Sequence, residues 1–229
     1  MLQPNNGKNL SILVDNVLWD RLPVKTHIIT DKDLIAEVVK KYVGECLKIG
    51  DLLFISERIV AISQGRAFPI KDIKPSCWAK WLVKFVHRSP YGIGLGSPWT
   101  MELAIREAGL SRILLAAFCS AVTKPFGLRG VFYHVVGKNI NAIDGPCSYT
   151  LPPYNEYAKL GPKNPNKVAR ELANKFNCPV IIIDANDLGV NILGRSDKNI
   201  THKFCQAVFK DNPLGQSSEQ TPMCIVRRH

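Results

Sequence analysis

The alternation of apolar and polar positions along the chain predicts amphipathic helices and short buried strands. Apolar residues at helical spacing predict helices over residues 33–42, 98–108 and 166–176. Short aliphatic runs bounded by polar residues or glycine predict buried strands over residues 52–55 and 179–183. Helices that alternate with buried strands are typical of an α/β or mixed α+β protein. No clean linker divides the sequence, so we expect residues 1–229 to form a single domain.

Other segments have a less definite pattern. Residues 59–62 form a second aliphatic run, and residues 112–122 fit a helix or a strand equally well. Residues 131–136 predict a strand, and the alternation in residues 138–144 predicts another strand that ends at Asp144.

Residues 75–88 predict a basic amphipathic helix, with Ser76 as its N-cap. Lys80, Lys84 and Arg88 recur every four residues, while aromatic residues line the other side. A membrane surface or RNA could bind such a helix. The favoured interpretation is that the aromatic side chains pack on the core and the basic ones are solvated, as in most surface helices.

Charge and cysteine content narrow the class of protein. The formal net charge is +11, with 16 basic and 11 acidic residues before position 116 and 14 and 8 after it. An evenly basic surface favours anionic partners in general and does not choose between a nucleotide, an acidic small molecule and RNA. Seven cysteines without a CxxC motif indicate reduced thiols. No apolar run approaches the ~20 residues of a membrane span, so we expect a cytoplasmic protein without membrane association.

Two carboxylates at predicted strand ends are the most informative chemical feature. Asp144 follows one predicted strand, and Asp184 follows another, with Asn186 and Asp187 just beyond. Oxygen ligands of this kind suit a hard divalent cation, and ligands of α/β proteins lie beyond the carboxyl ends of strands. Alternatively, both aspartates cap turns, and turn chemistry alone slightly favours that role.

The order of several motifs resembles the γ-glutamyl ligase family of the deazaflavin coenzyme F420, the CofE-like domain. The matches extend over residues 20–226. They are GDLLFI (50–55) with RIVAISQGR (58–66), PSCWAK (75–80), NAIDGPC (141–147), LGPKNPNKVA (160–169), IIDANDLG (182–189) and GQSSEQT (215–221).

The resemblance implies a CofE-like fold of mixed sheets with flanking helices. It also implies an enzyme of F420 biosynthesis that uses GTP, or ATP, with Mg²⁺ or Mn²⁺. Such an enzyme joins the amine of L-glutamate to an anionic carboxylate acceptor through an acyl phosphate. An intertwined homodimer is implied as well.

The resemblance also implies roles for individual residues. Asp144 and Asp184 correspond to ligands of the first metal, and Asp187 is a further oxygen donor beside them. The expected nucleotide-binding residues are Glu57, Arg58, Gly215, Gln216, Glu219 and Thr221. No catalytic residue is assigned.

The sequence departs from the family pattern at several positions, among them Gln64 in place of a glutamate and Ser148 in place of an asparagine. Ile62 stands where the family has a lysine, Ala185 where it has a hydroxyl side chain, and Ser217 where it has a glutamate. These departures define the alternative hypothesis, a non-catalytic module of the same fold that binds nucleotide and metal.

Overall fold

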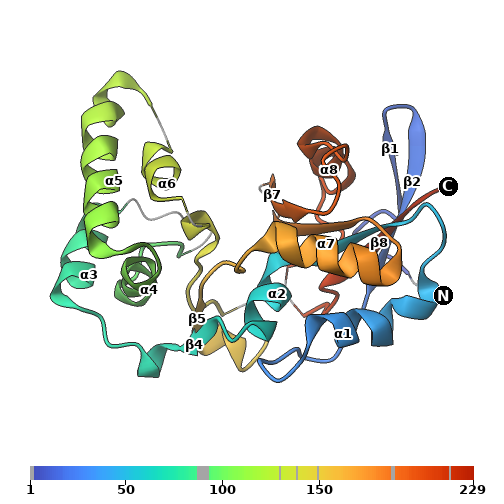
Figure 1. Ribbon diagram of the computed structural model, residues 1–229, viewed down its shortest axis with the longest axis horizontal. Coiled ribbons are helices and arrows are strands. Elements are labelled where there is room, and N and C mark those ends of the chain that lie inside the picture. The colour runs from blue at the N-terminus through green and yellow to red at the C-terminus, as the bar shows by residue number, and fades with distance from the viewer. Residues whose placement is uncertain are drawn as a thin grey trace. The chain divides into compact units, whose positions relative to one another are not determined.

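The chain folds into two compact units. The computed structural model describes residues 3–86, 93–128, 130–137, 139–148, 150–186, 189–216 and 218–229 (Figure 1). Unit 1 consists of Met1–Gly65 and Pro162–His229, and unit 2 consists of Arg66–Gly161. Unit 2 is therefore inserted between two segments of the chain that fold together.

Unit 1 is built on a six-stranded mixed sheet with the strand order β1-β2-β8-β3-β6-β7. The strands are β1 (Ser11–Val14), β2 (Val17–Val24), β3 (Leu52–Ser56), β6 (Val180–Asn186), β7 (Gly189–Arg195) and β8 (Met223–Arg228). Strands β3 and β6 are parallel, and the other neighbouring strands are antiparallel. The first and last segments of the chain thus form one sheet.

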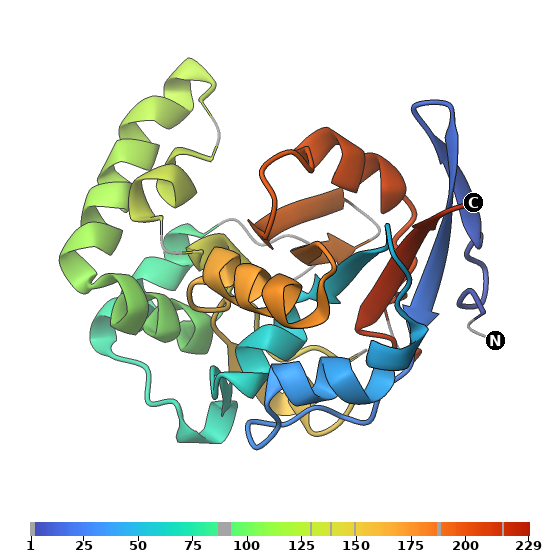
Figure 2. The ribbon, with the colours of Figure 1, turned by 45° about the vertical axis from the view of Figure 1, so that its right-hand side comes forward.

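Helices cover both faces of this sheet (Figures 1 and 2). They are α1 (Ile35–Tyr42), α2 (Glu57–Ser63), α7 (Pro165–Phe176) and α8 (His202–Val208), with a 3₁₀ turn at Gly44–Cys46. Figure 2 shows α8 on one face and α1, α2 and α7 on the other. Phe54 and Ile181 pack in one cluster with Val208 of α8. The central strands are apolar on both faces because neither face is open to water.

Unit 2 is mainly helical. It contains α3 (Cys77–Leu82), α4 (Pro98–Ala108), α5 (Leu110–Thr123) and α6 (Val131–Val136), and a small sheet of β4 (Ala67–Pro69) and β5 (Tyr157–Lys159). Short 3₁₀ turns lie at Ile70–Asp72, Val83–Phe85, Lys124–Phe126, Ile140–Ala142 and Tyr154–Glu156. Ser97 and Thr100 form a reciprocal capping box at the start of α4. A separate apolar core includes Met101, Ile113 and Leu160.

The expected mixed α/β architecture is confirmed. The aliphatic run of residues 59–62 belongs to helix α2, and all four residues are buried. Two local predictions are wrong. Residues 131–136 form α6 rather than a strand, because α6 lies beside α5 and buries Val136 against the unit 2 core (Figure 1). In the segment 138–144, residues 140–142 form a 3₁₀ turn, not a strand. Burial against neighbouring elements overrides β propensity at these positions.

The predicted basic helix is shorter than expected, and its aromatic side chains are not in the core. Helix α3 is capped by Ser76, whose side chain accepts a hydrogen bond from the Ala79 backbone. The helix tightens into a 3₁₀ turn at Val83. The buried residues of this segment are Ala79, Leu82 and Val83. The solvent-facing side carries Trp78, Trp81 and Phe85, which are 48%, 47% and 70% exposed. Arg88 lies outside the described residues.

Within the described ranges of the chain, no helix is both long and apolar enough to cross a bilayer.

Candidate functional site

Strand register brings distant segments of unit 1 side by side. Ser56 of β3 lies beside Ile183 of the parallel strand β6. On its other side, the Ser56 amide donates a hydrogen bond of 2.8 Å to the carbonyl of Pro222. Glu57 directly follows Ser56, Asp184 directly follows Ile183, and Thr221 directly precedes Pro222, so these three residues lie on neighbouring segments. This juxtaposition agrees with the rule that ligands gather beyond the carboxyl ends of parallel strands.

Glu57 and Arg58 open helix α2 directly after β3. Glu57 is only 4% exposed, whereas Arg58 is half-buried. The transition from β3 to α2 thus buries Glu57 and leaves Arg58 partly exposed.

Asp184 lies inside β6 and not at its end, which corrects the prediction from sequence. The strand continues to Asn186 because β7 returns antiparallel beside it, pairing Asp184 with Asn191. Ile183 and Ala185 pack on the cluster that includes α8. Since successive side chains alternate between faces, half-buried Asp184 points to the opposite face. Asp187 lies outside the described residues.

Side-chain contacts support the loop that runs from Gly215 to Thr221. The Asn212 side-chain amide donates a hydrogen bond of 3.0 Å to the Gly215 carbonyl. Gly215 has φ +75°, and a Cβ atom there would lie 2.4 Å from Cδ of Glu219, which folds over it. The left-handed backbone conformation favours glycine at this position, whereas the Glu219 side chain could move away from a Cβ atom. Gln216 is exposed, and Ser217 lies outside the described residues.

Thr221 has a structural role within this loop. Its hydroxyl donates a hydrogen bond of 2.7 Å to the Leu214 carbonyl and accepts one of 2.7 Å from the Asn5 side chain. Thr221 is buried, so both hydrogen-bonding functions of the hydroxyl are directed inward. Of the loop residues expected to contact nucleotide, Gln216 is exposed, and Gly215 and Glu219 are half-buried.

Asp144 belongs to unit 2, whereas Asp184 belongs to unit 1. The Asp144 backbone exchanges hydrogen bonds with Lys159, and its Oδ1 accepts a bond of 2.9 Å from the Gly145 amide. The turn-capping role considered from the sequence is thus present. A carboxylate has about four lone-pair positions, so capping is compatible with metal ligation.

No group of three or more His, Cys, Asp or Glu side chains that could hold a metal occurs in the described ranges. The expected set includes Asp187, which is outside those ranges. The metal site at Asp144, Asp184 and Asp187 therefore stays a prediction.

A cluster of His27, Tyr42 and Asp33 lies next to the loop and was missed from the sequence, which showed no triad spacing for any histidine. His27 Nδ1 is 2.8 Å from the Tyr42 hydroxyl, and Nε2 is 3.0 Å from Asp33 Oδ1. Thr26 and Gln220 exchange two hydrogen bonds, so this segment is attached to the loop. Burial acts to raise the pKa of Asp33, but hydrogen bonds from Thr30 and His27 outweigh it and lower that pKa.

Replacing Tyr42 with phenylalanine is expected to loosen the Thr26 segment. The hydroxyl contacts both the ring and the backbone amide of His27. Its loss should lower the free energy of unfolding by about 1 kcal/mol and speed hydrogen exchange at the Thr26 amide. Urea unfolding and exchange mass spectrometry measure both. Tyr133→Phe, on the exposed side of α6, is the control, and equal exchange in the two variants would contradict the assignment.

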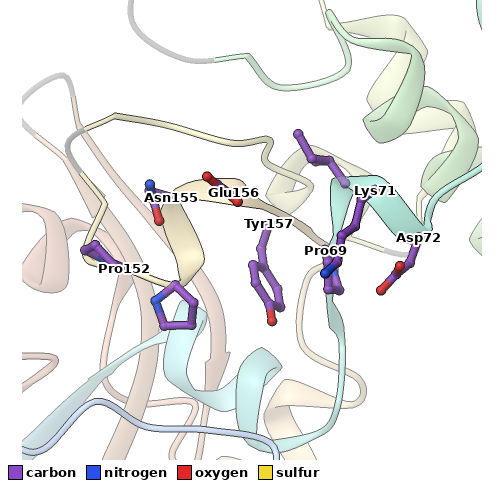
Figure 3. A pocket seen from close by; sticks show the side chains of 9 residues that line it. Pro69, Lys71, Asp72, Pro152, Asn155, Glu156 and Tyr157 are labelled. Carbon is purple, nitrogen blue, oxygen red and sulfur yellow. The ribbon is translucent and has the colours of Figure 1, made fainter.

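A cavity of about 520 Å³ lies within unit 2, at the 3₁₀ turn that follows β4 and the one that precedes β5 (Figure 3). It is lined by Pro69, Ile70, Lys71, Asp72, Pro152, Pro153, Asn155, Glu156 and Tyr157. In the view of Figure 3, the Tyr157 ring lies between Pro69 and Pro152. The residues expected to bind metal or nucleotide are absent from this lining.

Comparison with known proteins supports the ligase resemblance. No curated protein matches the chain. The family model described as F420-0:Gamma-glutamyl ligase matches residues 23–192, about three quarters of the sequence. The match spans both units and includes Glu57, Asp144 and Asp184, and it ends before the Gly215–Thr221 loop. The chain therefore belongs to the F420-0:gamma-glutamyl ligase family.

Proposed function

We propose that this chain is a nucleotide- and divalent-metal-dependent ligase that adds L-glutamate to an anionic carboxylate acceptor. The observation that carries the proposal is the arrangement of neighbouring strands in unit 1, where register brings Glu57 after β3, Asp184 within β6 and the Gly215–Thr221 loop before β8 onto adjacent segments. Family membership supports a ligase reaction.

The proposed reaction has two steps because a carboxylate is a poor electrophile. An acceptor carboxylate oxygen attacks the γ-phosphorus of GTP or ATP, and the bond to the departing nucleoside diphosphate breaks. The glutamate amine then attacks the acyl carbon of the acyl phosphate. A C–N bond forms, inorganic phosphate leaves, and the amine loses a proton to solvent or a base. Positioning and charge neutralisation are the main requirements of the first step.

Residues of the predicted site suit these requirements chemically. Asp184 and Asp144 offer the hard oxygen atoms that Mg²⁺ or Mn²⁺ prefers, and Asp187 is a third candidate. When bound, the metal would offset negative charge on the phosphates. Arg58 supplies a fixed positive charge at the start of α2, and the exposed Gln216 amide can donate hydrogen bonds from the loop.

The test is phosphate release by the purified chain. GTP or ATP, Mg²⁺ or Mn²⁺ and L-glutamate are supplied with a panel of carboxylic acids, and released phosphate is measured. Release that requires an acid, glutamate and metal together is the expected result. No release with any acid, with nucleotide still bound, would contradict ligase activity.

One observation favours the alternative of a non-catalytic binding module. Ile62, which replaces the lysine of the resembled pattern, is 5% exposed and packs inside unit 1 as part of α2. A buried aliphatic side chain offers a phosphate no charge. The same assay separates the hypotheses, because a binding module retains nucleotide without releasing phosphate.

A homodimer and a cytoplasmic location belong to the same proposal, and light scattering of the purified chain tests the dimer.

A further inference from the structure

Three exposed aromatic side chains form a ladder along α3 and the 3₁₀ turn that follows it. The aromatic ladder consists of Trp78, Trp81 and Phe85, which are about half or more exposed. The rings of Trp78 and Trp81 are 6.0 Å apart and those of Trp81 and Phe85 are 4.9 Å apart, both in edge-to-face geometry. They therefore make one continuous apolar ridge on the surface of unit 2, and an exposed ridge of this kind marks an interaction site more often than chance.

The ridge lies in a strongly basic part of the chain. Lys80 and Lys84 alternate with the aromatic residues and are exposed, and residues 73–101 contain no Asp or Glu. Unit 2 has 12 Lys and Arg against 5 Asp and Glu in 96 residues, a net charge of +7. The other 133 residues have 18 against 14, a net charge of +4. The charge that looked even along the sequence is thus concentrated in unit 2.

Exposed aromatic side chains are concentrated in the same unit. Within the described ranges, the large exposed aromatics are Trp78, Trp81, Phe85, Phe118, Phe126 and Tyr133. All of them belong to unit 2. Aromatic residues beside lysines suit the interface between lipid headgroups and acyl chains, where rings insert and ammonium groups remain at the phosphates.

Single-stranded RNA fits this surface less well. A chain of bases needs open ring faces on which successive bases stack. In the aromatic ladder the interplanar angles are 87° and 64°, so each ring edge is turned toward the face of its neighbour. The cluster therefore presents an apolar ridge and not a series of parallel platforms.

We propose that the aromatic ladder, with Lys80 and Lys84, docks unit 2 onto the surface of an anionic phospholipid bilayer. The rings enter the interface, and the lysines contact lipid phosphates and carboxylates. The contact is peripheral and reversible, because three side chains insert far less apolar area than a spanning helix.

Vesicle co-sedimentation of the full chain tests the proposal. Vesicles of phosphatidylcholine containing phosphatidylserine should retain the protein, those of phosphatidylcholine alone should retain much less, and rising salt should release it. The tryptophan emission should shift to shorter wavelength on binding to anionic vesicles, because Trp78 and Trp81 leave water.

Two sets of substitutions locate the contact. The triple variant Trp78→Ser/Trp81→Ser/Phe85→Ser and the double variant Lys80→Glu/Lys84→Glu should each weaken vesicle binding by about tenfold or more. The matched control, Lys198→Glu/Lys203→Glu, changes the same charge at exposed lysines of unit 1 and should bind as the parent does. The lysine variants keep the ladder intact, so they test the surface even if the triple variant folds poorly.

Other outcomes would overturn the proposal. They are absence of binding to anionic vesicles, equal binding by parent and both variants, and tighter binding to single-stranded RNA that depends on the ladder. A parent dimer that becomes monomeric in the triple variant would likewise assign this surface to a second copy of the chain.

Discussion

Replacing Asp184 with asparagine is expected to lower metal-dependent phosphate release by about 10³-fold. The substitution keeps the shape of the side chain and removes the negative charge. Loss of a ligand that holds the metal costs several kcal/mol of charge stabilisation, and about 4 kcal/mol corresponds to about 10³ in rate. Nucleotide binding in the presence of Mn²⁺, measured by calorimetry, should weaken in parallel.

The control for this prediction is Asp15→Asn. Asp15 is exposed in the turn between β1 and β2, with φ 50°, a conformation that asparagine adopts readily. This variant loses the same charge and should retain full activity. Metal-dependent nucleotide binding that is unchanged in Asp184→Asn would show that the carboxylate of β6 is not a ligand. Asp144→Asn is the companion variant, and unchanged binding in it would remove the Asp144 carboxylate from the predicted ligands.

Replacing Asp211 with asparagine should destabilise the protein by about 3 kcal/mol. Arg21 of β2 has a fully buried side chain that forms an ion pair with Asp211. Its guanidinium also donates hydrogen bonds of 3.1 Å to the Val208 carbonyl and 2.5 Å to the Asn9 carbonyl. Breaking such a pair leaves a buried charge uncompensated, at a cost of about 3–5 kcal/mol. We expect the lower value because the Asp211 side chain is 36% exposed.

Urea unfolding measures this loss, with Asp197→Asn as the control. Asp197 forms a local hydrogen bond with the Asn199 amide, so its replacement should change stability by less than about 0.5 kcal/mol. The double variant Arg21→Met/Asp211→Asn should recover part of the loss, because no buried charge then remains. A double variant that is less stable than Asp211→Asn would contradict this explanation.

The same ion pair predicts a pH dependence. Burial acts to raise the pKa of Asp211, but the hydrogen bond and charge of Arg21 outweigh it and hold that pKa below its ordinary value. A carboxylate with a lowered pKa contributes stability above its unfolded pKa of about 3.9, and this contribution is lost as the pH falls through the folded pKa. Parent stability should therefore fall more steeply below about pH 4 than that of Asp211→Asn.

The pattern of apolar positions was sufficient where the environment of an element is simple. Helices α1, α4 and α7 were predicted because one face of each is apolar. Strands β3 and β6 were predicted because both are aliphatic and short. The pattern failed at residues 131–136, which are rich in β-branched and aromatic residues and yet pack as a helix beside α5. It also failed for Trp78, Trp81 and Phe85, since composition does not show which side of a helix faces the core.

The sequence alone determined the family, the mixed architecture and the residue types at the candidate site, because local motifs and their order are written along the chain. Only the tertiary structure decided that Glu57, Asp184 and Thr221 lie on neighbouring segments, since strand register depends on pairing between segments far apart in sequence. It also decided that Asp144 and Asp184 belong to different compact units, that His27 contacts Asp33 and Tyr42, and that charge and exposed aromatics gather in unit 2. These features depend on how the chain folds in three dimensions, which no local pattern of apolar and polar positions encodes.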